Sequence, residues 1–332
     1  CVDDALRRGA LGIKILGGHY PLTPEATAAA IRIANARQAY VAFHAGTTDT
    51  KSDLHGFREA VTLIGEQGAH LAHINSYCRG LVDDPLRELM EVFARLEGHA
   101  HLVSESYLAL INGTSGRCAE GQPVSHVTRN CLQMGGFAVT TEGLEAAIRQ
   151  GFAQVTVTRN RENVLVHGPE GVEAWVEAAT DTTISFAVNS PQVLMLCATA
   201  KDAQGAFRVD AFSTDGGGIP RNVTVAKGLP LVQWGALTLE EFVVKSALNP
   251  ARMLGMVDKG HLGVGADADI TVLDMRRGRA VMGISGGKMI MIEGHVVGEQ
   301  GTVVTTKQGS ARLGDSGLRS QAIDLAQSRL YQ

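Results

Sequence analysis

Short apolar runs alternate with longer amphipathic segments along the first third of the chain. Four apolar runs predict strands, at residues 12–17, 40–44, 70–74 and 101–104. Three segments with apolar residues at helical spacing predict helices, at residues 26–38, 53–67 and 85–96. This alternation predicts a parallel sheet in an α/β protein, either a (β/α) barrel or an open doubly wound sheet. No GxGxxG sequence follows a strand, so the pattern does not favour dinucleotide binding.

The pattern changes twice in the remainder of the chain. Residues 113–205 are irregular and predict an insertion, after which residues 209–214 predict another strand and residues 239–248 a helix. From Gly260 onward, glycines separate short apolar runs, which predicts a small β-rich domain. The expected organisation is a barrel-like unit, a β-sandwich part and a polar, peripheral tail, at residues 1–258, 259–306 and 307–332.

Composition narrows the class of protein. The 332 residues are 45% hydrophobic and 19% charged, which allows a substantial buried core. A net charge of −4 argues against a nucleic-acid partner, and no run of about 18 apolar residues predicts a membrane span. The five cysteines are scattered without a CxxC pair, which argues against a disulfide scaffold and favours a reducing cytoplasm.

Four chemically active side chains lie in or at the ends of the predicted strands. They are Lys14, His44, His73 and Asp215. Because the carboxyl ends of barrel strands meet at one face, we expect these side chains to converge. Two imidazoles and a carboxylate are typical ligands of a catalytic divalent ion. A buried lysine would repel that ion as an ammonium, but as a neutral amine it can react with CO2 to form an anionic carbamate that bridges two ions.

Each of these residues also has an ordinary structural interpretation. A strand lysine commonly extends its ammonium to solvent, and a strand histidine commonly forms a hydrogen bond in the core. Asp215, which precedes three glycines, could simply form a turn. The order and spacing of all four residues are harder to explain in this way, because the steps from Lys14 to His44 and from His44 to His73 each match one βα unit.

At these residues the chain resembles the binuclear-metal branch of the amidohydrolase superfamily, which contains hydantoinases, dihydroorotases, allantoinases and isoaspartyl dipeptidases. The C-terminal segments NPARMLG and KGHLGVGADADI, at residues 249–255 and 259–270, are similar to the family's last helix and its return into the β-sandwich. The resemblance implies the C-terminal part of a (β/α)8 barrel of the TIM type, plus a small β-sandwich domain. It also implies that Asp267 and Asp269 are structural rather than catalytic.

The resemblance implies a role for each candidate residue. Lys14 is expected on the fourth barrel strand as the carboxylated lysine, His44 and His73 as ligands on the fifth and sixth, and Asp215 as ligand and catalytic base on the eighth. One or two divalent ions, expected to be zinc, would activate water as a metal-bound hydroxide for hydrolysis of an amide or cyclic amide C–N bond. The partner is then a small-molecule amide, and the substrate contacts are expected at His19, Asn75, Tyr77, Arg79 and Arg221.

Two other functions remain open at this stage. One is a catalytically inactive structural relative of the hydantoinases, against which the presence of all four site residues argues. The other is a deaminase of the same superfamily. Such enzymes usually use one metal ion and lack the strand lysine, so Lys14 favours the amide hydrolase.

One part of the family pattern is missing. The first strand of the family carries His-x-His, whereas the His-x-His of this chain, residues 99–101, follows the sixth-strand position. A complementary N-terminal chain or segment is therefore expected to supply these ligands, and Cys1 is a candidate cleavage site, with an artificial chain start as the alternative. Assembly into a homo-oligomer or hetero-oligomer is expected by analogy.

Overall fold

A five-stranded parallel sheet forms the centre of the fold. The computed structural model describes residues 2–160, 162–299, 301–314 and 316–332, so Cys1 lies outside the described residues. Neighbouring strands follow in the order β1 (Gly12–Leu16), β2 (Tyr40–His44), β3 (Ala69–Leu71), β4 (Leu102–Tyr107) and β11 (Ala211–Ser213). All pairs are parallel, and the strand order never reverses. That order is typical of a (β/α) barrel, since a doubly wound sheet reverses its order at a switch point.

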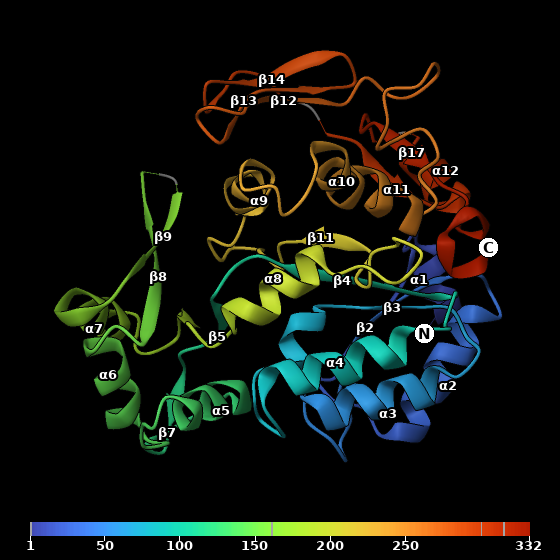
Figure 1. The fold of residues 1–332 in the computed structure, drawn as a ribbon. Helices are drawn as coiled ribbons and strands as arrows, with labels where there is room; N and C mark the ends of the chain where they lie inside the picture. Colours follow the sequence, from blue (N-terminus) through green and yellow to red (C-terminus); the bar gives the residue numbers. More distant parts are fainter. Residues whose placement is uncertain (1, 161, 300, 315) are drawn as a thin grey trace.

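Amphipathic helices cover the outer face of this sheet (Figure 1). They are α2 (Pro24–Asn35), α3 (Leu54–Ile64) and α4 (Pro85–Leu96), preceded by the short α1 (Val2–Arg7). The side chains of Thr23, Asp53 and Asp84 cap the three longer helices by accepting main-chain N–H groups of their first turns. The predicted helices are thus present. Their apolar faces pack on the strands, where Val41, Phe43 and Leu71 are fully buried.

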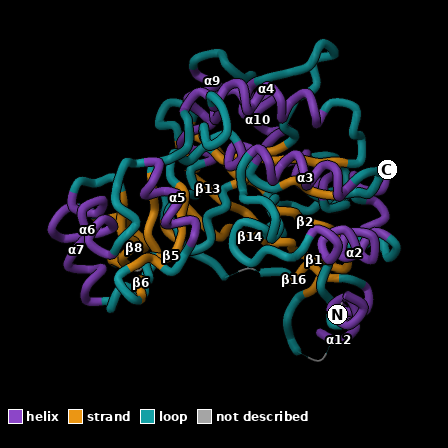
Figure 2. Tube along the Cα trace, turned by 90° about the horizontal axis from the view of Figure 1, so that it is seen from below, coloured by secondary structure: helices purple, strands orange, loops and turns teal. Residues whose placement is uncertain are grey.

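The predicted insertion is a separate α/β layer that lies to one side of the barrel strands (Figure 1 and Figure 2). Its antiparallel sheet has the order β5 (Asn112–Ser115), β10 (Thr183–Phe186), β8 (Ala153–Arg159) and β9 (Glu162–Val166). Its helices are α5 (His126–Met134), α6 (Thr141–Arg149) and α7 (Gly168–Glu177), and a short hairpin joins β6 (Cys118–Ala119) to β7 (Gln122–Pro123). Leu144, Trp175 and Phe186 form its own core. The chain then returns to the barrel in α8 (Pro191–Thr199), which packs on α4 and β4.

The helix predicted at residues 239–248 begins as expected but widens in its second half. After α9 (Thr224–Gln233) come α10 (Leu239–Val243), a π-helical turn (Val244–Leu248) and α11 (Asn249–Met253). Pro250 has no N–H for the carbonyl of Ser246, which favours the wider turn. The β-rich part that follows is one antiparallel sheet of β12 (Ile270–Asp274), β13 (Arg279–Ser285), β14 (Lys288–Ile292) and β15 (His295–Val296).

The segment after residue 306 was expected to be peripheral. Part of it packs against strands β2 and β4 of the parallel sheet. Besides α12 (Lys307–Leu313), it contains β17 (Ser320–Ala322), which pairs with β16 (Val303–Thr305), and two 3-10 turns (Leu325–Gln327 and Arg329–Tyr331). Leu330 is 2% exposed and lies in a cluster with Tyr40 and Val103. The hydroxyl of Ser328 donates to the carbonyl of Met253 at 2.6 Å. A few apolar residues, spaced among polar ones, are enough to anchor such a segment.

Replacing Leu330 with alanine is expected to destabilise the whole domain. The substitution would leave a cavity in a closed cluster, and the free energy of unfolding should fall by about 2–5 kcal/mol. Denaturant unfolding followed by circular dichroism measures the change. Leu318→Ala is the matched control, because Leu318 is 59% exposed and its truncation should change stability by only about 0.5 kcal/mol. Equal stability of the two variants would contradict the structural role of the segment.

The lengths of the helices and the state of the cysteines complete the description of the fold. Across the described ranges, no helix combines the length and the apolar character needed to cross a membrane. Cys78, Cys118, Cys131 and Cys197 are free thiols.

Candidate metal centre

The four predicted site residues line one cavity at the carboxyl ends of the parallel strands. The cavity has a volume of about 830 Å³, and its lining includes Lys14, His44, His73 and Asp215. Lys14 lies within β1 and His44 ends β2, as expected. His73 was expected inside a strand, but β3 ends at Leu71. His73 instead has left-handed backbone dihedral angles, with φ at 55°, directly before the 3-10 turn Ile74–Tyr77.

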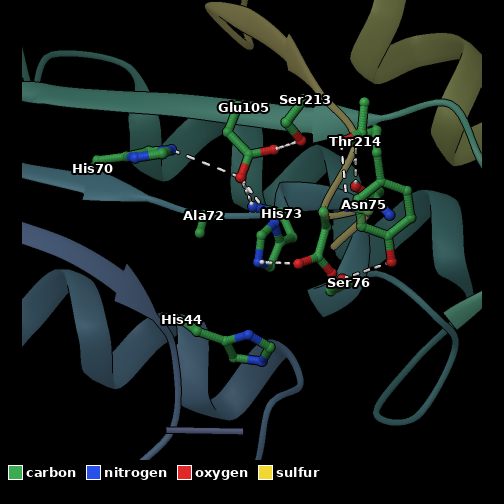
Figure 3. A network of polar contacts seen from close by, with 12 residues as sticks. His44, His70, Ala72, His73, Asn75, Ser76, Glu105, Ser213 and Thr214 are labelled. Atoms are coloured by element: carbon green, nitrogen blue, oxygen red, sulfur yellow. Dashed lines mark hydrogen bonds and ion pairs between the residues drawn. The ribbon is translucent and has the colours of Figure 1, made fainter. Parts of the chain in front are cut away.

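Glu105 of β4 contacts the His73 ring (Figure 3). The Nδ1 atom of His73 lies 2.8 Å from Oε1 of Glu105, and the main-chain N–H of His73 donates to the same oxygen at 2.8 Å. The opposite ring nitrogen, Nε2, lies 3.5 Å from Oδ1 of Asp215. Nε2 is therefore the nitrogen of His73 that is left for an ion, as in the carboxylate–histidine–metal arrangements of many metalloenzymes.

His44 presents the other ring nitrogen. Its Nε2 lies 2.7 Å from the hydroxyl of Ser52, which leaves Nδ1 for an ion. The ring centroids of His44 and His73 are 5.4 Å apart. Burial, reinforced by the neighbouring His73 and His19, lowers the pKa of His44 well below 6.5. The ring therefore stays neutral at physiological pH. Because the unfolded chain would bind this proton more readily, His44 makes stability fall as the pH drops below about 6.5.

Lys14 lines the cavity, and its surroundings disfavour its charged form. It keeps exposed surface at the cavity mouth, yet the surrounding protein desolvates its ammonium. That desolvation lowers the pKa of Lys14 despite the attraction of Glu105 and Asp215. The lowered pKa increases the fraction of the Lys14 amine that is neutral.

Glu105 has the most unusual environment of the site. All six residues of β4 are buried, and Glu105 is 4% exposed. Burial alone would raise the pKa of this carboxyl group, but the imidazoles of His73 and His70 outweigh burial and hold the pKa well below its usual range. Sequence reasoning assigned Glu105 no role. A carboxylate in a fully buried strand was the signal that could have singled it out.

Asp215 sits at a strained backbone position, with φ at 45°. Arg221 reaches back to it and contacts its Oδ2 at 2.9 Å and its main-chain carbonyl oxygen. The Arg221 side chain is buried and lies over the Tyr107 ring at 5.2 Å. Its Nε and Nη1 atoms are buried and have no hydrogen-bond partner among the residues that the structure describes. A buried cation with two unpaired nitrogens leaves room for a further acceptor.

The five residues expected to contact substrate divide into two groups. His19 and Arg221 line the cavity. The other three belong to the supporting structure beneath it. The Tyr77 hydroxyl donates to the Ala72 carbonyl at 2.6 Å and accepts from Ala45 N–H at 3.0 Å.

Arg79 and Asn75 are likewise occupied within the protein. The Arg79 guanidinium donates to Oδ1 of Asn189 at 2.9 Å and to Ser76 and Tyr107. Oδ1 of Asn75 accepts from the Tyr107 main-chain N–H at 3.3 Å. The 3-10 turn after His73 directs these side chains into the fold, which the sequence pattern did not indicate.

The insertion supplies a cavity wall that sequence reasoning missed. This wall is neutral and rich in hydroxyl and amide groups, from Asn112, Thr156, Thr158, Asn163, Thr182 and Thr183. Asn163 also donates to the Gly218 carbonyl at the edge of the cavity. The positions became recognisable only in the fold, since nothing in their local sequence distinguishes them from surface polar residues.

The donors present fit a divalent ion. Within the part of the chain that the structure describes, no three His, Cys, Asp or Glu side chains already form a group able to hold a metal ion. However, His73 Nε2, His44 Nδ1 and the Asp215 carboxylate are ligand types suited to zinc, and each is presented by a side chain of the same cavity. Lys14 adds a fourth donor if its amine is carboxylated.

Comparison with known proteins identifies the family. Residues 15–297 match the amidohydrolase family, and the chain belongs to it. A dihydroorotase from Syntrophus aciditrophicus is 36% identical over 124 residues, which are 36% of this chain and 26% of that protein. One component of the formyltransferase/hydrolase complex Fhc from Methylorubrum extorquens is 29% identical over 115 residues, which are 33% of this chain and 21% of that component.

Solved structures confirm the predicted fold class. N-acyl-D-glutamate deacylase from Bordetella bronchiseptica, complexed with zinc and a phosphonate inhibitor, is similar with a TM-score of 0.58 at 12% identity, over 87% of this chain and 61% of that one. D-aminoacylase, whose centre is binuclear, matches with a TM-score of 0.57 at 12% identity, over 90% of this chain and 63% of that one. The chain thus spans about a quarter of the first curated relative and less than two thirds of these structures.

Proposed function

We propose that this chain carries the catalytic site of a metal-dependent hydrolase that cleaves an amide or cyclic amide C–N bond, a bond other than a peptide bond. The observation that carries the proposal is the convergence of Lys14, His44, His73 and Asp215 on one cavity. Family membership supports the same class of reaction. The small-molecule substrate would enter from the cavity mouth, past the polar wall of the insertion.

The proposed ligands divide between the strands. His44 and His73 would contribute one ring nitrogen each, Asp215 a carboxylate oxygen, and Lys14, once carboxylated, a carbamate oxygen, to hold one or two divalent ions, which we take to be zinc. Such ions act as Lewis acids that polarise a carbonyl group and lower the pKa of water toward neutrality.

Asp215 performs the proton transfers of the proposed reaction. It takes one proton from the attacking water, whose oxygen forms the new bond to the carbonyl carbon. It then delivers that proton to the nitrogen as the C–N bond breaks. The contact with Arg221 at 2.9 Å keeps the carboxylate in place. His19 and Arg221 are the proposed substrate contacts, and Arg221 would bind a substrate carboxylate.

A complementary chain or segment would complete the site with His-x-His. The parallel sheet of the described residues has two open edges, β1 and β11, which could each pair with a further strand. A relative is part of a formyltransferase/hydrolase complex, which supports assembly with other chains. The proposed setting is the reducing cytoplasm, in agreement with the four free thiols.

Native mass spectrometry with metal analysis tests this proposal on protein purified from its source. We expect bound zinc, a mass increase equal to one CO2 and an associated polypeptide with His-x-His. Hydrolysis of a panel of cyclic amides, N-acyl amino acids and N-formyl compounds should stop after chelation and resume when zinc is restored. Protein that contains no ion, and that hydrolyses none of these compounds with zinc supplied, would contradict the proposal.

A further inference from the structure

Glu105 connects the two strand ends that carry His73 and Asp215. Its Oε1 atom receives the main-chain N–H of His73 and lies 2.8 Å from the Nδ1 atom of that ring. Its Oε2 atom accepts the hydroxyl of Ser213, on the neighbouring strand β11. His70 approaches from the other side, with Nε2 at 3.7 Å from Oε1 (Figure 3). One buried carboxylate thus contacts both sides of the candidate metal centre.

The chemistry of a carboxylate determines what this contact does to the ring. An ionised carboxylate offers only lone pairs, so a ring nitrogen 2.8 Å from its oxygen is favoured there when it carries the proton, although this contact falls outside good hydrogen-bond geometry. A lone pair on that nitrogen would face negative charge at short range. The proton is therefore held on Nδ1, and the lone pair is left on Nε2, the nitrogen that faces Asp215.

The main-chain contact acts on the backbone of His73. A non-glycine residue at φ 55° is energetically unfavourable unless its surroundings stabilise it. The hydrogen bond from the His73 N–H to Glu105 supplies such stabilisation. Ser213, which donates to the other carboxylate oxygen, lies two residues before Asp215 and links the position of that residue to the same group.

We propose that Glu105 is a positioning residue that sets the tautomer and orientation of His73 and, through Ser213, aligns Asp215 with the same ring nitrogen. The inference rests on the proposed function only in that His73 serves there as an ion ligand. The tautomer itself is a property of the ion-free chain and can be measured without any catalytic assay.

Nitrogen NMR of 15N-histidine-labelled, ion-free protein tests the inference. At a pH of about 9, roughly 2.5 units above the ordinary imidazole pKa, the His73 signals should show a protonated Nδ1 and an unprotonated Nε2. The variant His73→Gln assigns these signals. In Glu105→Ala the preference should be lost and the proton should move largely to Nε2. Glu105→Gln keeps an acceptor oxygen of the same size and should retain the wild-type tautomer.

Two further variants separate a local effect from general damage. Ser213→Ala removes only the second contact and should leave the tautomer of His73 unchanged. Asp258→Asn, at an exposed position, should change nothing. If Glu105→Ala does not fold, as judged by thermal unfolding, Glu105→Asp shortens the side chain while keeping its charge and should weaken the Nδ1 preference. An unprotonated Nδ1 in the wild type, or an unchanged tautomer when the contact is removed or shortened, would overturn the inference.

Zinc affinity provides a second readout. Competition with a chelating dye should show affinity weakened about 10- to 100-fold in Glu105→Ala, the usual effect of losing a group that orients a ligand. The expected tautomer together with failure of the assembled protein to bind zinc would contradict the proposed function and leave the tautomer assignment standing. Zinc binding and hydrolysis with a tautomer that does not depend on Glu105 would contradict the positioning role alone.

Discussion

Replacing Lys14 with alanine is expected to lower kcat/KM by at least about 10³-fold, equivalent to about 4 kcal/mol of transition-state stabilisation. Without the amine no carbamate can form, so the metal content of the protein should also fall. Lys14 is the only lysine that lines the cavity among the residues that the structure describes there, so no neighbouring lysine can substitute for it. Metal analysis and steady-state kinetics on the assembled protein measure the two effects.

A matched control and a rescue experiment make the Lys14 result specific. Lys227→Ala, at an exposed position of α9, should leave both metal content and kinetics unchanged. Acetate or propionate added to Lys14→Ala should restore part of the activity, because a small carboxylate can occupy the vacated space and supply the missing oxygen ligand. Unchanged metal content and activity in Lys14→Ala would refute the carbamate.

Replacing Asp215 with asparagine should reduce kcat by about 10²- to 10⁴-fold and change KM much less. An amide has nearly the same shape and can still accept a hydrogen bond from Arg221, but it cannot take the proton of the attacking water. With zinc supplied in excess to offset the loss of a carboxylate ligand, the expected loss concerns the chemical step rather than folding or substrate binding. Steady-state kinetics, with thermal unfolding as a check on the fold, measures it.

The control for Asp215 is Asp269→Asn together with Asp258→Asn. Asp269 contacts Lys259 and accepts the Gly286 N–H, so its replacement should alter stability but not kcat. Asp258 is exposed and its replacement should be neutral. A kcat for Asp215→Asn within twofold of the wild type would show that another group carries the proton.

The parallel sheet was predictable because its signal is local. Each barrel strand is a short apolar run, and each covering helix has an apolar stripe and a capping residue such as Thr23 or Asp84. The strand at Ala69–Leu71 was predicted too long, because His73 continues the apolar pattern although its backbone has already turned. Periodicity reports which faces are apolar, and it does not report a left-handed dihedral angle that a distant carboxylate stabilises.

The candidate site was predictable only in part. Lys14 and His44 are about one βα unit apart and lie on strands. These two facts were sufficient to predict that both side chains line one cavity at the carboxyl ends of the strands. Tyr77 and Arg79 follow the same strand end and looked equally suited to contact substrate, but their partners lie inside the fold. One of these partners, Asn189, lies 110 residues from Arg79 along the chain, so no local pattern could identify it.

By itself, the amino-acid sequence determined the alternation of strands and helices, the order of the barrel strands and the four side chains directed to their carboxyl ends, because these depend on local periodicity and on parallel topology. Tertiary structure alone decided that Glu105 contacts His73, that Arg221 contacts Asp215 and that the insertion forms a wall of the cavity. These arrangements join segments that are distant along the chain. They depend on the balance between burying a charge and pairing it, and that balance is established only once the chain has folded.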